Sequence, residues 1–211
     1  LVMIHTVSAQ WDELLALYER ALENTSDPGR RAELLDEAAH VAKDCAAQPD
    51  RAIDFMLQLQ RLRPTDAQLA TALERLLERR ERFADLVELW TQRLPLLPRD
   101  GRLGLRVRIA TTCLARLSRP DRALESCRLL LEEDPRDVLG CRLLERIVVH
   151  DGASQDVRRA ALALLHGRYA AANRSEDLVR VLALSLDLAS PEARPSLHRE
   201  AAGHSVQPGR L

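Results

Sequence analysis

The sequence predicts an all-α fold in which antiparallel helical hairpins stack into a solenoid. Leu and Ala dominate the apolar residues, and aromatic residues make up only 3% of the 211-residue chain, which favours helices over a β-sandwich. Apolar residues recur at helical spacing along most of the chain. The tetrapeptide at 49–52, Pro-Asp-Arg-Ala, recurs letter for letter at 120–123, which defines an offset of 71. Self-similarity at a fixed period is typical of repeat architectures, whose stacked units share one elongated core.

The repeat continues on both sides of this tetrapeptide. At the offset of 71 the paired positions are Arg31 and Arg102, Leu34 and Leu105, Ala39 and Ala110, Pro64 and Pro135, Asp66 and Asp137, and 73–75 and 144–146. The apolar pattern at 11–22 returns at 83–94, an offset of 72, so one connecting loop is a residue longer. A third copy follows at an offset of 92, which predicts an insertion near 150–170 that adds or lengthens a helix.

The apolar spacing and the residues that punctuate it predict the individual helices. They are expected, in chain order, at 9–24, 29–46, 50–62, 66–80, 83–95, 101–117, 120–133, 136–149, 154–172, 175–188 and 191–203. Asp50 and Asp121 stand where two of these helices start and are expected to accept hydrogen bonds from the free N–H groups of the first turn. Most prolines fall in the gaps, where each ends one helix without breaking the next.

Four helices in each repeat unit correspond to two hairpins of about 35 residues, joined by loops so short that neighbouring helices are antiparallel. We expect one array over 1–203 and a polar tail at 204–211. Its hairpins are expected at roughly 1–25, 29–63, 66–96, 101–134, 136–189 with an inserted helix, and in part at 191–203. Both ends fall inside a repeat, which suggests a segment of a longer array or self-association through uncapped ends.

A hairpin of this length, with small residues in both helices and a proline after the second, resembles the tetratricopeptide repeat family. The residues at these positions are Ala39, Ala52 and Pro64 in the unit 31–64, and Ala110, Ala123 and Pro135 in the unit 102–135. The resemblance covers most of 9–202. It is specific for a helical-hairpin solenoid and does not select a subfamily, because Val107 and Leu114 stand where the family carries a large residue and a tyrosine.

The resemblance implies a right-handed superhelix whose first helices line a concave face that binds proteins or peptides. On that face Glu37 and Asp44 stand where Arg108 and Arg116 stand one unit later, at offsets of 71 and 72. These four residues are the candidate partner-binding residues. The set of Lys, Asn and Arg with which clamp-type members of the family hold a C-terminal carboxylate is absent at these positions, so a ligand of that kind is not expected.

Charge and cysteine usage narrow the possible partners. The formal net charge is −1, so no overall basic surface attracts nucleic acid or an anionic membrane. Arg102 and Arg106 share a helix face, which is interpreted as scattered surface charge, with contact to an acidic partner as the alternative. No apolar run approaches the ~20 residues of a membrane helix. The four cysteines lie in helical patterns without a CxxC pair, so reduced, mostly buried thiols in a cytoplasmic protein are expected.

No pattern of catalytic or cofactor-binding residues stands out. The six histidines are scattered, without a metal-ligand spacing, and neither a phosphate-binding glycine loop nor a nucleophile elbow is present. We therefore expect no enzyme activity, no cofactor and no metal. The sequence favours a protein–protein interaction scaffold. One alternative is a signal-responsive regulatory segment of a larger transcriptional or signalling protein, and another is an RNA-binding helical repeat, which the net charge disfavours.

Overall fold

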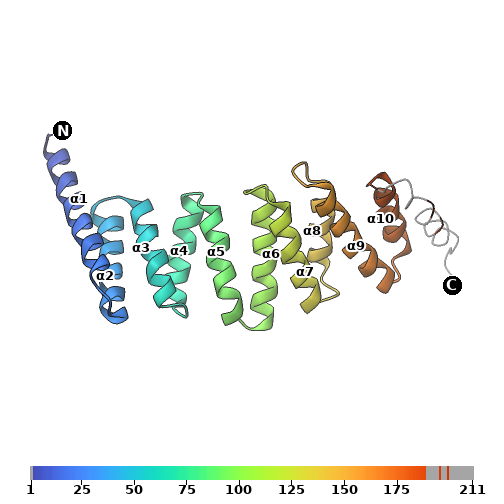
Figure 1. The fold of residues 1–211 in the computed structure, drawn as a ribbon, viewed down its shortest axis with the longest axis horizontal. Coiled ribbons are helices and arrows are strands. Elements are labelled where there is room, and N and C mark those ends of the chain that lie inside the picture. The colour runs from blue at the N-terminus through green and yellow to red at the C-terminus, as the bar shows by residue number, and fades with distance from the viewer. Residues whose placement is uncertain (1, 189–194, 196–198, 200–211) are drawn as a thin grey trace. The chain divides into compact units, whose positions relative to one another are not determined.

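The computed structural model describes residues 2–188, 195 and 199, and every element in this part of the chain is helical (Figure 1). The elements are α1 (Val2–Glu23), α2 (Pro28–His40), the π-helical segment η1 (Val41–Cys45), α3 (Pro49–Leu62), α4 (Ala67–Arg79), α5 (Phe83–Arg93), the 3₁₀ segment η2 (Leu94–Leu96), α6 (Arg99–Ala115), α7 (Pro120–Glu133), α8 (Val138–Val148), α9 (Gln155–Ala171) and α10 (Ser175–Leu188). The all-α prediction is confirmed.

The chain divides into two compact units, residues 1–96 and 97–211. In unit 1 each helix from α1 to α5 packs on the next along the chain, and in unit 2 the same holds from α6 to α10. Unit 2 also packs α6 on α8 and α7 on α9. Sequential packing of neighbours is what short loops between helices impose. The stacking of all the hairpins into a single solenoid over 1–203 stays a prediction.

Two helix boundaries differ by more than two residues from those expected. Helix α1 begins at Val2 instead of residue 9, because residues 2–8 contain neither glycine nor proline to stop the helix. The helix expected at 29–46 changes after His40 to one π-helical turn, Val41–Cys45. The helix expected at 191–203 and the tail at 204–211 lie outside the described residues, apart from 195 and 199.

Loop geometry repeats at both of the offsets found in the sequence. Ala47 and Ser118, which the offset of 71 relates, have φ of 52° and 51°. In each of these loops the next amide donates to the carbonyl six positions upstream, at 2.7 and 2.9 Å. Glu81 and Asn173, which the offset of 92 relates, have φ of 53° and 54°, and the next amide donates five positions upstream at 2.9 Å in both. Positive φ is disfavoured for residues with a Cβ, and in this chain it recurs in the loops that the two offsets relate.

The insertion expected near 150–170 supplies one whole helix, α9. Unit 1 has α4 alone between α3 and α5, whereas unit 2 has α8 and α9 between α7 and α10. The start of α8 matches the start of α4 at the offset of 71, since both helices have an aspartate N-cap. The loop after α9 matches the loop after α4 at the offset of 92. The added helix α9 therefore reverses the chain once more and places α10 beyond α8.

The core of each unit is aliphatic and includes the small repeat positions. Ala52, Ala110 and Ala123 are fully buried and Ala39 is 6% exposed, as close approach of neighbouring helices requires. Both repeat prolines, Pro64 and Pro135, are exposed in the loops after α3 and α7. Here the chain turns without a backbone donor that would need a partner.

The helix caps differ from the sequence prediction. The residues before α3 and α7 are Gln48 and Arg119, and neither makes a side-chain cap hydrogen bond. A proline occupies the first position of each helix, so Asp50 and Asp121 lie inside the first turn and the prediction that they cap was wrong. Proline at that position already removes one of the N–H groups that a cap would satisfy.

Asp66 and Asp137, the repeat pair at the starts of α4 and α8, are the residues that cap. The Asp66 carboxylate accepts from two backbone amides at 3.0 Å, and that of Asp137 accepts from the Gly140 amide at 2.6 Å. We expect Asp66→Ala and Asp137→Ala each to lower the free energy of unfolding by about 0.5–2 kcal/mol in urea denaturation followed by circular dichroism. Asp36→Ala, at an exposed position inside α2, is the control and should change it by less than about 0.5 kcal/mol. Equal losses in all three variants would contradict the assignment.

Candidate functional site

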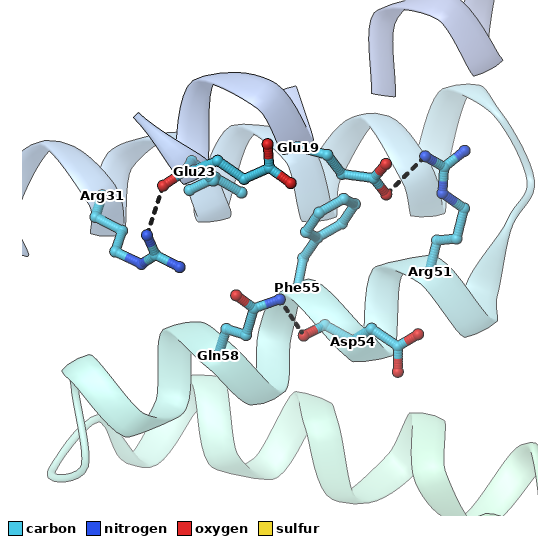
Figure 2. A pocket seen from close by; sticks show the side chains of 8 residues that line it. Glu19, Glu23, Arg31, Arg51, Asp54, Phe55 and Gln58 are labelled. Atoms are coloured by element: carbon cyan, nitrogen blue, oxygen red, sulfur yellow. Dashed lines mark hydrogen bonds and ion pairs between the residues drawn. The ribbon is translucent and has the colours of Figure 1, made fainter. Parts of the chain in front are cut away.

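Unit 1 carries a shallow groove of about 240 Å³ between α1, the start of α2, and α3 (Figure 2). It is lined by Glu19, Leu22, Glu23, Arg31, Arg51, Asp54, Phe55 and Gln58. Leu22 and Phe55 are 4% and 3% exposed and form its apolar floor. Figure 2 shows the Phe55 ring directed from α3 toward the acidic side chains of α1. The lining residues recur at three- and four-residue spacing because each helix presents one face to the groove.

The charged groups of this groove are mostly paired with the protein itself. Arg51 contacts Glu19 at 2.8 Å and Asp12 at 3.4 Å, and Arg31 donates to the Leu22 carbonyl at 2.6 Å. The charges of a ligand would have to compete with these existing contacts. Any ion pair that the ligand formed in a site open to water would itself contribute little to binding. The unit 1 groove is therefore a poor candidate for a strong binding site.

Unit 2 carries a larger groove of about 550 Å³ between α8 and α10, within the size range typical of ligand sites. It is lined by Arg142, Glu145, Arg146, Val148, Val149, Arg180, Val181 and Leu184. Val148 and Val181 are 7% and 1% exposed and form the floor. Val149 and Leu184, which are 69% and 37% exposed, line the groove above this floor. Together with Val148 and Val181, these two side chains give the groove its aliphatic surface.

One acidic residue of the unit 2 groove is held by its neighbours. Glu145 accepts a hydrogen bond from the Tyr169 hydroxyl at 2.8 Å and is ion-paired with Arg180. Burial, and then the hydrogen bond to Glu145, raise the pKa of Tyr169, so its hydroxyl stays protonated and donates. Arg174 lies over the same ring, 4.8 Å from its centroid. The carboxylate of Glu145 is thus held in place by hydrogen bonds from Tyr169 and Arg180.

The two arginines of α8 that line this groove differ from Arg180. Arg142 and Arg146 are exposed, and within the described part of the chain neither has a carboxylate at ion-pair distance. Arg180 contacts Glu145 and also Asp177, the latter at 3.2 Å. The groove therefore joins an aliphatic floor to two guanidinium groups that have no carboxylate partner among the described residues.

The four residues proposed from the sequence lie elsewhere. Glu37 is exposed on α2 and accepts from the Tyr18 hydroxyl at 3.1 Å, and Asp44 in η1 contacts His40 at 2.8 Å. Arg108 is exposed on α6, and Arg116 is exposed at the C-terminal cap of that helix. None of the four lines either groove. Their role in binding stays a prediction.

The basic face on α6 has an internal acidic partner. Arg102 and Arg106 contact the two carboxylate oxygens of Glu133 on α7 at 3.0 and 3.1 Å. The hydrogen bond from Arg102 is the main reason why the pKa of Glu133 lies below its ordinary value. These arginines are therefore used to join α6 to α7, and neither sequence interpretation of them anticipated that pairing.

The unit 2 groove has a signature that comparison of the two copies would have revealed. At the offset of 71, Val149 stands in the place of Glu78, and at the offset of 92, Leu184 stands in the place of Gln92. Arg142 replaces Thr71, whereas Arg146 has an equivalent arginine at 75. Unit 2 thus has aliphatic residues at two positions where unit 1 has exposed polar ones.

Comparison with known proteins leaves the family open, because the chain matches no protein-family model and no curated protein is significantly similar to it. No group of three or more His, Cys, Asp or Glu side chains among the described residues is placed to hold a metal ion. None of the helices described is long and apolar enough to cross a membrane.

Proposed function

We propose that this protein is a non-catalytic interaction module that binds a partner protein or peptide, and that its hairpins form a solenoid of the tetratricopeptide repeat type. The observation that carries the proposal of binding is the unit 2 groove, where Val149 and Leu184 remain exposed beside a buried aliphatic floor. The loop geometry that recurs at the offset of 71 supports the repeat architecture. The three buried, unpaired cysteines support a reducing compartment such as the cytoplasm.

The physical basis of binding would be the removal of this aliphatic surface from water. Burying one Val or Leu side chain contributes about 1.5–3 kcal/mol relative to leaving it exposed. Two such side chains, added to the edge of the floor, are enough to give a partner a preferred position in the groove. Interfaces commonly depend on a few central side chains of this kind, while the surrounding contacts exclude water.

A test compares two exposed valines of the same helical segment. Val149 at the end of α8 lines the groove, whereas Val138 at its start is 55% exposed and does not. The full chain is immobilised, bound proteins are identified by mass spectrometry, and the affinity of the recovered partner is measured by calorimetry. We expect Val149→Ser to weaken binding about tenfold, the equivalent of ~1.4 kcal/mol, and Val138→Ser to leave it unchanged.

Two results would contradict the proposal. One is a partner whose affinity is insensitive to Val149→Ser. The other is a reproducible hydrolase or transferase activity that is lost on a point substitution while the helical circular dichroism spectrum stays intact.

A further inference from the structure

The exposed side chains of α8 that border the unit 2 groove form one stripe. Arg142, Arg146 and Val149 follow one another at intervals of four and three positions, so they lie on the same face of the helix over two turns. Two cationic positions are thus followed by an aliphatic one. A second helix lying along this stripe has side chains at the same one-turn spacing.

Helix α10 repeats this order on the other side of the groove. Arg180 is followed four positions later by Leu184, and both line the groove. Short loops join α8 to α9 and α9 to α10, and α9 packs on both neighbours, so α8 and α10 run in the same direction (Figure 1). The ion pair between Glu145 and Arg180 fixes their register. Val149 lies four positions after Glu145, and Leu184 lies four positions after Arg180. The two aliphatic side chains are therefore at the same end of the groove.

The groove is consequently divided into a cationic end and an aliphatic end. Three arginines and one glutamate line it, and that glutamate is already engaged by Arg180 and Tyr169. Arg142 and Arg146 have no anionic partner among the described residues. A cation that is unmatched within the protein favours a carboxylate on the partner, and guanidinium groups bind carboxylates in well-defined geometry.

We propose that the groove between α8 and α10 binds an acidic amphipathic helix of a partner protein. Two carboxylates one turn apart on that helix contact Arg142 and Arg146, and aliphatic side chains one turn further on pack against Val149 and Leu184. This inference rests on the proposed function and specifies the chemistry of the partner. A helical partner fits because both walls are helices and no strand edge in the described chain offers a template for an extended peptide.

The direct test uses three fluorescein-labelled, end-blocked peptides of about 14 residues, a length at which a helix begins to be stable. The first has two glutamates four positions apart and two leucines one turn further on. The second has lysines in place of the glutamates, and the third has serines in place of the leucines. By fluorescence anisotropy with the full chain, we expect the first to bind at least tenfold more tightly than either of the others, and to weaken as salt is raised.

A charge-reversed protein supplies the specific variant. Arg142→Glu with Arg146→Glu should weaken the acidic peptide at least tenfold and strengthen the lysine peptide. Arg75→Glu with Arg79→Glu is the matched control, since these two arginines are also four positions apart and exposed on α4, and Arg75 is the repeat equivalent of Arg146. Both double variants change the net charge equally, so the control should bind the acidic peptide as the wild type does. Circular dichroism verifies that both remain helical.

Three outcomes would overturn the inference. They are lysine-peptide binding as tight as that of the acidic peptide, acidic-peptide binding unaffected by the charge reversal at 142 and 146, or no acidic-peptide binding up to millimolar concentration. A single-stranded oligonucleotide tests the alternative ligand. If it binds the wild type and its binding is lost when positions 142 and 146 are charge-reversed, the arginines bind phosphates and the inference is wrong. If the acidic peptide fails while a captured partner still depends on Val149, the acidic chemistry is wrong and the proposed function stands.

Discussion

Leu144→Ala is expected to lower the free energy of unfolding by about 2–5 kcal/mol, the range for truncating a fully buried leucine. Leu144 lies on α8 with no exposed surface, and its repeat equivalent Leu73 is fully buried on α4. The loss has two parts, the transfer free energy of the removed carbons and the cavity that rigid neighbours cannot fill. Against a total stability of about 5–15 kcal/mol for a domain, this is a large fraction.

The readout can separate the two units. Trp11 and Trp90, the two tryptophans of the chain, both lie in unit 1, so tryptophan fluorescence follows unit 1 while far-ultraviolet circular dichroism follows all the helices. In urea denaturation, Leu73→Ala should lower the midpoint of both the fluorescence and the circular dichroism transitions. Leu144→Ala should lower at least the midpoint of the circular dichroism transition. Leu139→Ala, at a residue 48% exposed on the same helix as Leu144, is the control and should stay within about 0.5 kcal/mol of the wild type. A Leu144→Ala variant as stable as this control would contradict the assigned core.

Local pattern was enough to predict the helices, because each helix buries a stripe of its own residues. Leu73 and Leu144 are conspicuous as apolar positions in matching contexts, and both are fully buried. The repeat offsets also survive in the backbone, since Ala47 with Ser118 and Glu81 with Asn173 take the same unusual φ. Helix periodicity and loop conformation depend on residues that are near one another in sequence. They can therefore be predicted from one sequence without knowledge of tertiary contacts.

The caps and the internal ion pairs could not be predicted in the same way, since they depend on which residue begins a helix and on what lies across from it. Asp50 precedes an apolar run and was expected to cap α3, but proline at position 49 begins that helix one residue earlier. Asp50 instead contacts Arg80 at 2.6 Å. Arg80 is the C-cap residue of the next helix, α4. Nothing local in the sequence indicates such a partner.

The groove in unit 2 depends on packing between helices that are distant in sequence. Val149 and Leu184 border the same groove only because the inserted helix α9 reverses the chain between them. A search for residues shared between repeats selects core positions, such as the buried Ala52 and Ala123. The side chains at 149 and 184, where the two units differ, are not selected in this way.

The exposed cysteine is expected to react with thiol reagents much faster than the three buried ones. Cys45, in the π-helical segment, is exposed, whereas Cys113, Cys127 and Cys141 are buried and unpaired. Burial is the largest cause that raises the pKa of Cys127, to about 12. The thiolate is the reacting species, so at pH 8 a thiol of pKa about 12 is ionised roughly 1000-fold less than an ordinary one of pKa ~9. Exclusion of the reagent from the core slows the reaction further.

A colorimetric thiol assay on the folded protein measures this difference. We expect one thiol per chain to react rapidly at pH 8, with the other three reacting only after denaturation in guanidinium chloride. Cys45→Ser, the specific control, should remove the rapid phase, and mass spectrometry of the labelled peptides should locate the slow thiols on α6, α7 and α8. A rapid phase that survives Cys45→Ser, or that exceeds one thiol, would show that the core is open.

The same burial implies that stability falls with rising pH above the ordinary thiol range. The folded-state pKa of Cys127 is raised, so its contribution is fully present below the unfolded-state value of about 9 and is lost as pH rises toward about 12. Within that window one such group gives a slope of up to about 1.4 kcal/mol per pH unit. Burial is also the main cause that raises the pKa of Cys113 and of Cys141, so both thiols add to the decline.

Replacing the most deeply buried thiol should therefore change how stability depends on pH. Cys127→Ala should lower stability at pH 7, because it truncates a fully buried side chain, and should flatten the decline at alkaline pH in urea titrations. Leu139→Ala, at an exposed residue without an ionisable side chain, should leave that slope unchanged. An unaltered slope in Cys127→Ala would show that burial does not keep this thiol protonated.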